Sequence, residues 1–389
     1  MKKNRKFKFI DLFAGVGGFH QAMTQLGGEC VFASEIDKYC QETYTLNYKI
    51  KPYGDIRNIN EKSIPKHDVL CAGFPCQSFS KAGYQKGLSD TRGTLFFEIE
   101  RILKYHKTKY IVLENVRNLI SHDNGKTWKI IKNSLETLGY RLTPEPLVLS
   151  PHYFRIPQLR ERVVILGIYD CNNVNDKLSI KFDNIATKND NSIYSIVKNI
   201  KVNKKYYISD HEEYVLNAWD EFYKGIKEKI IGFPIWSNYF KTKSINSKFP
   251  EWKKEFIKKN KNLYNNNKLF IDKWIKKYNN LDSFNDTEKK FEWQAGKNIT
   301  SLWEGIIQFR PSGIRVKNPT CFPALVAMVQ IPIIGKYKRR LTVEEASLLQ
   351  SFPKEFIPNE DQHEAYKQFG NAVNVEVIKQ AAHKLFNYV

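Results

Sequence analysis

The fold of this chain is decided by the stretch Asp11-Leu12-Phe13-Ala14-Gly15-Val16-Gly17-Gly18-Phe19, near its start. Residues 8–13 are apolar and typical of a buried strand, whereas residues 19–26 have the spacing of an amphipathic helix. The glycines between them let the backbone approach a ligand closely, and the first turn of the helix offers unpaired N–H groups. Because their spacing differs from the GxGxxG pattern of dinucleotide-binding proteins, a nicotinamide-dependent dehydrogenase is disfavoured.

The same alternation of strand and helix continues to about residue 170. Further strands are expected at 29–34, 68–72, 110–113, 141–149 and 162–169, and helices at 36–47, 94–105 and 127–138. This order predicts an α/β fold with a mostly parallel sheet and helices on both faces, whose ligands bind at the carboxyl ends of the strands. Helical spacing returns at 340–352 and 376–386. Between 170 and 300 it gives way to lysine and asparagine clusters with scattered tryptophans, which predict a second, irregular folded domain.

Length and composition narrow the class of protein. The 389 residues suffice for two domains, and a hydrophobic fraction of 42% excludes a disordered chain. No apolar run reaches the roughly 18 residues that a membrane helix needs, and the basic start does not resemble a secretion signal. The six cysteines form no CxxC pair, so we expect a cytoplasmic protein with reduced thiols and no metal site.

The net charge of +21 is concentrated in the middle of the chain. Lysine supplies all of the positive charge there, since no arginine occurs between Arg162 and Arg310. Lysine suits non-specific attraction to phosphates, whereas base recognition favours the bidentate arginine side chain. An AT-rich coding bias would produce the same lysine excess without such a partner, so a polyanion is one of two explanations.

Two carboxylates follow successive expected strands. Glu35 lies 20 residues after Gly15, at the end of the second strand, where an acid can accept both hydroxyls of a ribose. Asp55, in the segment Gly54-Asp55-Ile56, is suited to accept a hydrogen bond from an adenine amino group. Either acid alone would be an ordinary surface carboxylate, but their positions at successive strand ends favour a nucleoside site.

A cysteine occupies the next strand end, in the segment Gly73-Phe74-Pro75-Cys76-Gln77-Ser78-Phe79-Ser80. The Pro-Cys pair after a buried strand places the thiol at the end of the strand, where nearby donors would lower its pKa and make it a nucleophile. The alternative is a buried structural cysteine, which is the usual state of a free thiol. Gly83 and Gly87 fit the hinges of a loop over residues 81–92 that closes on a substrate.

Charged residues also flank the strand at 110–113. Glu114 follows this strand, and a partly buried carboxylate tends to have a raised pKa, which suits it to hold or share a proton. In the segment Gln158-Leu159-Arg160-Glu161-Arg162, alternation places Gln158, Arg160 and Arg162 on one side. The two arginines would pair with Glu114 or bind a base and a phosphate; a charged surface strand is the alternative.

Six segments together resemble, in order and spacing, the motifs of the DNA cytosine-C5 methyltransferases. They are Asp11–Phe19, Gly73–Ser80, Glu114–Val116, Gln158–Arg162, Arg340–Pro353 and Gly370–Val373. The resemblance covers residues 7–169 and 335–389, and residues 76–97 are especially similar to the bacterial type II restriction–modification enzymes. It implies a Rossmann-like, S-adenosylmethionine-dependent methyltransferase domain over 1–180 and 336–389, onto which the last helix packs. Residues 181–335 would form a smaller, irregular target-recognition domain.

The resemblance also implies a reaction. Cys76 would add to carbon 6 of a cytosine flipped out of duplex DNA, which activates carbon 5 to take the methyl group from S-adenosylmethionine and leaves S-adenosylhomocysteine. Glu114 would contact N3 and the exocyclic amine, Arg162 would bind the base oxygen O2, and Arg160 would support the loop or a phosphate.

Three further groups of residues follow from the resemblance. The expected cofactor contacts are Phe13, Gly15, Gly17, Glu35, Ile36, Asp55, Ile56, Leu95, Asn371 and Val373. The expected DNA contacts are Ser80, Lys81, Arg92, Arg310 and Arg315. The last two lie in residues 307–315, where the resemblance disappears; the nearby glycine and prolines predict a tight loop that presents them to guanine edges, and phosphate contacts or solvated arginines are the alternative. The implied partners are double-stranded DNA and, functionally, a restriction endonuclease; we expect a monomer that is associated with the bacterial nucleoid and not with a membrane.

Two alternatives keep the same fold. A tRNA cytosine-5 methyltransferase is disfavoured because that branch has different residues around the cysteine. A catalytically silent DNA-binding protein is disfavoured because every expected catalytic residue is present.

Overall fold

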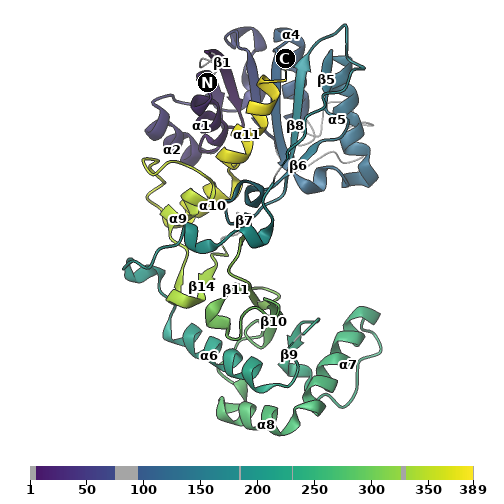
Figure 1. The fold of residues 1–389 in the computed structure, drawn as a ribbon, viewed down its shortest axis with the longest axis vertical. Coiled ribbons are helices and arrows are strands. Elements are labelled where there is room, and N and C mark those ends of the chain that lie inside the picture. The colour runs from purple at the N-terminus through teal and green to yellow at the C-terminus, as the bar shows by residue number, and fades with distance from the viewer. Residues whose placement is uncertain (1–5, 75–94, 184, 230, 326–329, 389) are drawn as a thin grey trace. The chain divides into compact units, whose positions relative to one another are not determined.

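The computed structural model describes residues 6–74, 95–183, 185–229, 231–325 and 330–388 (Figure 1). The chain divides into two compact units. Unit 1 comprises Met1–Asn191, Ala324–Val329 and Val343–Val389, and unit 2 comprises Ser192–Pro323 and Gln330–Thr342. These boundaries differ by 7 to 11 residues from the expected ones at 180/181 and 335/336. The functions expected for the two parts stay predictions.

Unit 1 is built on a seven-stranded sheet in the order β2-β1-β3-β4-β8-β5, with β6 also paired to β8. The strands are β1 (Phe7–Leu12), β2 (Gly28–Ser34), β3 (Val69–Gly73), β4 (Tyr110–Val116), β5 (Tyr140–Leu142), β6 (Leu147–Leu149) and β8 (Arg162–Tyr169). The pairings from β2 to β4 are parallel, whereas β8 is antiparallel to β4, β5 and β6. Among these seven strands β8 alone is therefore reversed, which confirms the mostly parallel sheet.

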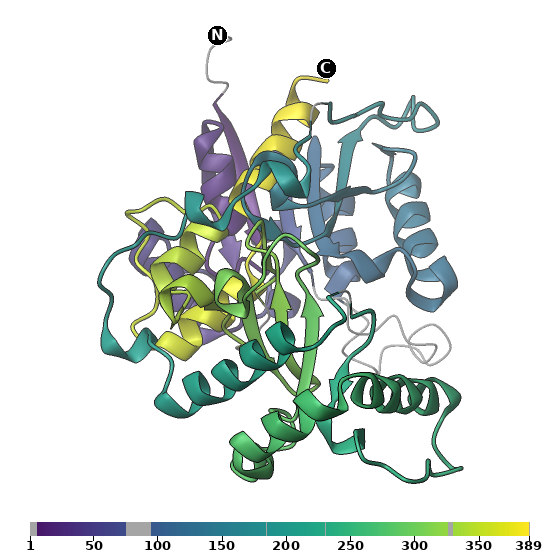
Figure 2. The same cartoon turned by 60° about the horizontal axis from the view of Figure 1, so that its bottom comes forward.

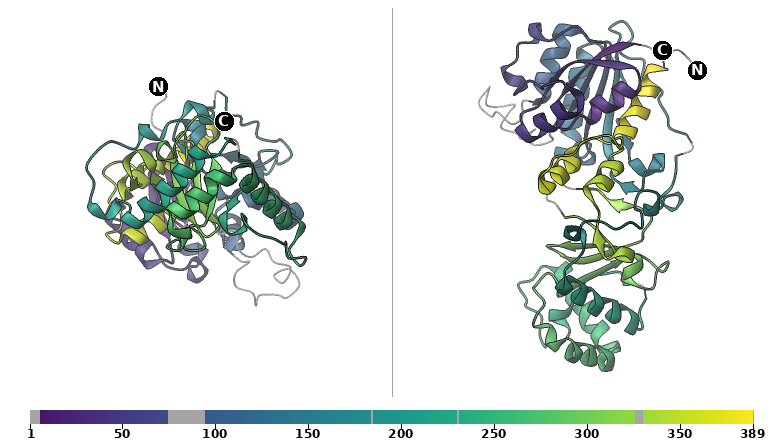
Figure 3. Two further views of the ribbon diagram at one scale, coloured as in Figure 1. Left: turned by 90° about the horizontal axis from the view of Figure 1, so that it is seen from below. Right: turned by 90° about the vertical axis from the view of Figure 1, so that its left-hand side faces the viewer.

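Helices cover both faces of this sheet. The helices of unit 1 are α1 (Gly18–Gln25), α2 (Lys38–Tyr48), α4 (Leu95–His106), α5 (Lys126–Thr137), α9 (Val343–Leu349), α10 (Gln362–Asn371) and α11 (Val375–Phe386). Because strand side chains alternate, Ile10 and Leu12 of β1 share one core cluster with residues of α4 and α5. On the other face α11 packs beside α1, although the two are over 300 residues apart in sequence (Figure 3).

Two expected elements of unit 1 differ in the structure. The strand expected at 141–149 is interrupted, since β5 and β6 pair with successive parts of β8 and residues 143–146 lie between them. Pro144 and Pro146 lack the N–H groups that a continuous ladder needs. The helical pattern at 340–352 corresponds to the shorter α9, because Arg339–Arg340 form strand β15 of unit 2.

Unit 2 contains more regular structure than its weak periodicity indicated. Its six-stranded sheet has the order β15-β14-β11-β12-β10-β9. Figure 2 shows the strands and helices of this unit, mostly in teal and green. The strands are β9 (Ile235–Trp236), β10 (Lys290–Gln294), β11 (Ile306–Arg310), β12 (Gly313–Lys317), β14 (Ile333–Ile334) and β15 (Arg339–Arg340). The helices are α6 (Asp210–Gly225), α7 (Glu251–Asn266) and α8 (Lys268–Lys277). Two short strands, β7 (Gln158–Leu159) in unit 1 and β13 (Phe322–Pro323) in unit 2, complete the set.

The core of unit 2 is built around aromatic rings. Trp219 of α6 is fully buried and stacks on Phe291 of β10, with ring centroids 4.9 Å apart and planes within 6°. Its ring also contacts Trp274 of α8 at 5.3 Å, and its indole N–H donates to the carbonyl of Glu288 at 2.8 Å. The scattered tryptophans of the sequence thus hold helices and sheet of this unit together.

Within the part of the chain that the structure describes, no helix combines the length and the apolar character needed to cross a lipid bilayer.

Candidate functional site

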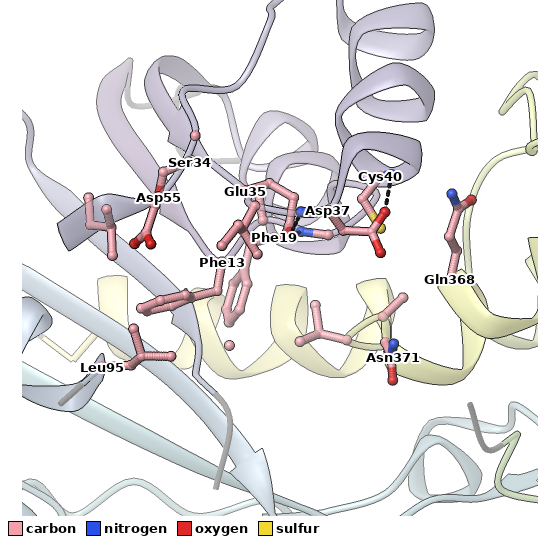
Figure 4. Close-up of a pocket in the computed structure, with 18 of the residues that line it drawn as sticks. Phe13, Phe19, Ser34, Glu35, Asp37, Cys40, Asp55, Leu95, Gln368 and Asn371 are labelled. Carbon is pink, nitrogen blue, oxygen red and sulfur yellow. Dashed lines mark hydrogen bonds between the residues drawn. The ribbon is translucent and has the colours of Figure 1, made fainter. Parts of the chain in front are cut away.

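A cavity of about 440 Å³ lies in unit 1 at the carboxyl ends of β1 to β4 (Figure 4). This volume falls in the range of small-molecule sites. Its lining comes from the carboxyl ends of β1 to β4, residues 54–57, the starts of α1, α2 and α4, and the end of α10 with the two residues after it. The lining residues are Phe13, Ala14, Gly15, Phe19, Ser34, Glu35, Ile36, Asp37, Cys40, Gly54, Asp55, Ile56, Arg57, Gly73, Leu95, Glu114, Gln368, Asn371, Ala372 and Val373.

The glycine turn after β1 forms one wall of the cavity. Phe13 has a φ of +56°, a left-handed backbone that is rare for a bulky residue and typical of functional sites. Gly15 has a φ of +55°, and a Cβ added there would meet no atom within 4 Å, so the backbone borders open space. Gly17, in contrast, does not line the cavity. Its φ is +85°, and a Cβ would come within 2.2 Å of the Tyr48 ring, so its glycine serves packing at the start of α1.

Glu35 lies at the end of β2 with both carboxylate oxygens engaged. Oε2 accepts the backbone N–H of Gly15 at 2.8 Å, and Oε1 accepts that of Asp37 at 2.8 Å. Burial raises the pKa of Glu35, while the N–H donors of Asp37, Gly15 and Ile36 oppose this shift. Since a carboxylate offers about four acceptor positions, Glu35 can still accept two hydroxyl groups of a ligand.

Asp55 is held by a neighbour that the sequence analysis did not single out. Arg57 Nε lies 3.0 and 2.9 Å from the two carboxylate oxygens of Asp55, and the backbone N–H of Arg57 donates to the same group at 3.0 Å. The side-chain hydrogen bond from Arg57 lowers the pKa of Asp55. Arg57 also lines the cavity, so this carboxylate faces it ionised and fixed in orientation.

The segment after α10 closes the cavity from the far end of the chain. Asn371, Ala372 and Val373 all line it. A Cβ at Gly18 would approach within 2.6 Å of the Val373 side chain, so the close contact between α1 and this segment requires glycine. Residues from the first and last tenths of the sequence therefore form one site.

Glu114 and Arg162 form an ion pair at the edge of the same cavity. They lie on the paired strands β4 and β8, and Arg162 Nε is 3.1 Å from Glu114 Oε1. Burial raises the pKa of Glu114, and the charges of Arg162 and Arg160 counteract this rise. This pair combines a buried carboxyl group, whose pKa burial raises, with a cation beside it.

Most of the expected cofactor contacts meet at this cavity, since nine of the ten line it and Gly17 does not. Further residues line the cavity that were not predicted from the sequence, and six of them directly adjoin expected ones: Ala14, Ser34, Asp37, Gly54, Arg57 and Ala372. Proximity to a strand end could have indicated them. Cys40 and Gln368 lie on helices α2 and α10 and carried no such indication.

Comparison with known proteins now bears on the chain as a whole. The family model described as C-5 cytosine-specific DNA methylase matches residues 7–387. The chain belongs to this family. It is a DNA (cytosine-5)-methyltransferase, and enzymes of this kind use S-adenosylmethionine.

Relatives of this methyltransferase include type II methyltransferases, two of which match nearly the whole chain. M.BanI of Aneurinibacillus aneurinilyticus is 34% identical over 98% of this chain and 96% of its own length. M.AluI of Cellulosimicrobium cellulans is 30% identical over 97% of this chain and 91% of its own length. M.HhaI of Haemophilus parahaemolyticus is 52% identical over 41% of this chain and 48% of its own length.

Solved structures share the fold of the methyltransferase at lower identity. The Entamoeba histolytica methyltransferase EhMeth is 17% identical with a TM-score of 0.57, and covers 98% of both chains. S. pombe Dnmt2 methyltransferase is 17% identical with a TM-score of 0.54, again over 98% of both chains.

Arg160 of the methyltransferase is placed differently from one of its expected roles. It is only 2% exposed, and its guanidinium donates to the carbonyls of Leu325 at 3.1 Å and Ala372 at 2.8 Å. Burial, with Arg162 beside it, lowers the pKa of Arg160 to about 9. A buried guanidinium bound to carbonyls fits the supporting role better than contact with a phosphate, and both roles stay predictions. Its contacts hold the segment that carries Asn371 and Val373.

Four expected site residues, Cys76, Ser80, Lys81 and Arg92, lie outside the described residues. Other cysteines fit the structural alternative, since Cys71 is fully buried and burial raises the pKa of Cys30 to about 12.

Arg310 and Arg315 of the methyltransferase lie on the hairpin of β11 and β12 in unit 2. Arg310 pairs with Gly313 across a two-residue turn, which confirms the expected tight loop. Both guanidinium groups lie against one carboxylate, however. Arg315 Nε is 2.8 Å and Arg310 Nη1 is 3.5 Å from Glu292, and the two side chains are 22% and 24% exposed. Glu292 thus positions both arginines, which the sequence did not indicate.

Proposed function

We propose that this enzyme transfers a methyl group from S-adenosylmethionine to carbon 5 of a cytosine flipped out of a short duplex DNA site, through a transient bond between Cys76 and carbon 6. The observation that carries the proposal is the Glu114–Arg162 ion pair at the rim of the cavity in unit 1. It brings a buried carboxyl group and a cation to the place where cofactor and base have to meet.

The cavity suits S-adenosylmethionine in shape and in donor set. The Phe13 and Phe19 rings give it apolar surface, and open space adjoins the backbone at Gly15 and Gly54. Glu35 would hold the ribose hydroxyls, and Asp55 would accept from the adenine amino group while Arg57 fixes its orientation. The remaining expected contacts, Ile36, Ile56, Leu95, Asn371 and Val373, complete the lining. When bound, the cofactor supplies an electrophilic methyl group.

The residues of the chain would act in a fixed order. The thiolate of Cys76 adds to carbon 6 of cytosine, which moves electron density to carbon 5. Glu114 contacts N3 and the exocyclic amine and stabilises the charge that develops there, while Arg162 binds O2. After carbon 5 has gained the methyl group it loses its proton, and elimination of Cys76 restores the aromatic ring. Arg160 acts as a positioning residue through Leu325 and Ala372.

DNA recognition would divide between the two units. Ser80, Lys81 and Arg92 would contact the strand around the flipped base, whose extrusion costs a few kcal/mol. Unit 2 would be the target-recognition domain, with Arg310 and Arg315 at guanine edges in the major groove. The relatives M.BanI and M.HhaI are type II methyltransferases, which supports a type II system in which this methylation protects DNA from a cognate endonuclease.

The test measures transfer of tritium from labelled S-adenosylmethionine to plasmid DNA and, in parallel, to transfer RNA. The wild type should label DNA alone, Cys76→Ala should label neither, and duplex DNA containing 5-fluorocytosine should trap a covalent complex with the wild type only. Bisulfite sequencing of the same plasmid would identify the site. Normal labelling by Cys76→Ala would exclude the nucleophile, and preferential labelling of RNA would exclude the substrate.

A further inference from the structure

Residues 241–277 of unit 2 carry an unusual share of the positive charge. They contain twelve lysines against three acidic residues, a net charge of +9 out of +21 for the whole chain. Lysine supplies all of the positive charge, because the segment has no arginine. Helices α7 and α8 form most of it (Figure 1).

The two helices separate an apolar side from a lysine side. Ile257 and Leu263 of α7 and Ile271 and Trp274 of α8 are buried. Lysine is the commonest residue at the exposed positions of the helices, where it occurs six times: Lys258, Lys259, Lys268, Lys273, Lys276 and Lys277. We call these six residues the lysine face. Such amphipathic helices are positioned by their apolar side, so the charged side is free of any packing role.

Most of this charge is not compensated within the protein. Glu251 pairs with Lys254, Asp272 pairs with Lys241 and Lys268, and Glu221 pairs with Lys277. Among the described residues, eight lysines of the segment have no acidic partner within 4.0 Å: Lys243, Lys248, Lys253, Lys258, Lys259, Lys261, Lys273 and Lys276.

Some of these uncompensated charges also repel one another. Lys258 and Lys261 lie three positions apart on one helix, as do Lys273 and Lys276, and like charges at this spacing disfavour the helix. A bound polyanion would relieve that repulsion.

The chemistry of the face favours a phosphate backbone over other polyanions. Lysine is a flexible point charge that attracts phosphates without base preference, whereas arginine is the usual base reader. The 16-residue helix α7 is about 24 Å long, the length of roughly seven base pairs of DNA. A membrane is a poor match, because only Trp252 and Leu269 among the apolar residues of these helices are well exposed.

We propose that the lysine face binds the DNA backbone outside the recognised bases and supplies much of the non-specific DNA affinity of the enzyme. The inference rests on the proposed function in that duplex DNA is the ligand. It assigns base contacts to the Arg310–Arg315 hairpin and backbone contacts to α7 and α8, two different parts of unit 2.

The test uses the full chain and a fluorescent 30-base-pair duplex of random sequence. Lys258→Gln, Lys259→Gln, Lys273→Gln and Lys276→Gln are combined in one variant. The control combines Lys104→Gln, Lys107→Gln, Lys126→Gln and Lys129→Gln, four exposed lysines of unit 1, so both variants lose the same charge. The dissociation constant is measured from 50 to 200 mM KCl, and the thermal midpoint confirms that both variants are folded.

The lysine-face variant should bind at least tenfold more weakly at 50 mM KCl, and the slope of log Kd against log salt should fall by about 2 to 4, close to one unit per lost phosphate contact. The control should match the wild type. At saturating plasmid DNA, the rate of methylation by the lysine-face variant should be unchanged.

Three results would overturn the proposal. The first is an unchanged slope of log Kd against log salt in the lysine-face variant. The second is an equal loss of DNA affinity in both variants, which would indicate an effect of total charge. The third is a loss of affinity for poly-glutamate as large as the loss for DNA, which would indicate an acidic protein partner. Binding is measured without turnover, so a wild type that fails to methylate DNA would overturn the proposed function and leave this measurement valid.

Discussion

Units 1 and 2 differ in the residues that form their cores and in where they place their charged side chains. Unit 1 has a core of aliphatic side chains from parallel strands and collects carboxylates at one sheet edge, around a cavity. Unit 2 contains six of the seven tryptophans, most of them in its core, and carries lysines on its surface. The difference indicates that the first unit gains its chemistry by enclosing groups, whereas the second presents them on exposed helices and a hairpin. Each variant below should damage one unit and spare the other.

The largest effect is expected from Glu114→Gln in unit 1. The amide keeps the shape of the side chain but cannot hold or give up a proton, so the rate of methyl transfer should fall by about 10²- to 10⁴-fold. The measurement is single-turnover tritium transfer to plasmid DNA. Non-specific DNA affinity should stay within twofold of the wild type.

Glu161→Gln is the matched control for that variant. Glu161 directly precedes Arg162 but pairs with Arg117 at the surface, so its loss should change the rate less than threefold. An equal loss in both variants would remove Glu114 from the proposed mechanism.

Trp219→Ala should lower the free energy of unfolding of unit 2, and only of that unit. Removal of a fully buried indole costs about 3 to 5 kcal/mol, and here it also leaves the Glu288 carbonyl without its N–H donor. Chemical denaturation followed by tryptophan fluorescence reports almost entirely on unit 2, because unit 1 contains only Trp128. Trp219→Phe should lose less.

Calorimetric titration with S-adenosylmethionine completes this comparison. The affinity of the Trp219→Ala protein should remain that of the wild type, because the cavity lies in unit 1. If the Trp219→Ala protein loses cofactor affinity as well as the stability of unit 2, the two units do not behave independently.

A smaller, pH-dependent effect is expected at His20 in unit 1. Its ring is buried, stacks on Tyr48 at 3.9 Å and lies 2.7 Å from the Tyr44 hydroxyl, and burial lowers its pKa to about 4. The unfolded chain therefore binds the proton near pH 6.5 while the folded chain does not, so His20 costs no stability above pH 6.5 and destabilises the fold as the pH falls toward 4. The shift corresponds to about 3 kcal/mol.

His20→Gln isolates this contribution, because the variant cannot titrate. The difference in unfolding free energy between wild type and variant should narrow by about 3 kcal/mol from pH 7 to pH 4, measured by pulsed hydrogen exchange of α1 in urea. Other buried groups such as Asp11 titrate in both proteins, so their contributions cancel in the difference between the two unfolding free energies. A constant difference would mean that burial leaves the pKa of His20 the same in the folded and the unfolded chain.

Prediction from sequence succeeded best for the strands that are buried on both faces of the sheet. The strands of unit 1 are continuous apolar runs, so their ends could be placed and with them Phe13, Glu35 and Glu114. Asp55 also lines the cavity, but it precedes a short 3-10 turn between β2 and β3 and does not lie at a strand end as expected. The catalytic and binding roles of these residues stay predictions. Helix α10 and the role of Gln368 in the lining were not anticipated, because a short helix with few apolar positions has little periodicity.

Unit 2 was less predictable for a related reason. In α7 only Ile257, Leu263 and Tyr264 among the apolar residues are buried, and the lysines between them obscure the pattern. The pairing of Arg310 and Arg315 with Glu292 depends on the neighbouring strand β10, which no local pattern specifies. Tertiary contacts, not local preference, decide these features.

The closure of the cavity by Asn371 and Val373 has a consequence for synthesis of the protein. A nascent chain emerging from the ribosome has completed the glycine turn, all the strands and unit 2 long before it reaches these residues. If the cavity is the cofactor site proposed above, it is completed only at the end of translation. A messenger broken between the codons for residues 277 and 371 would then yield fragments that carry the proposed DNA-binding lysines but lack Asn371 and Val373 of the cavity.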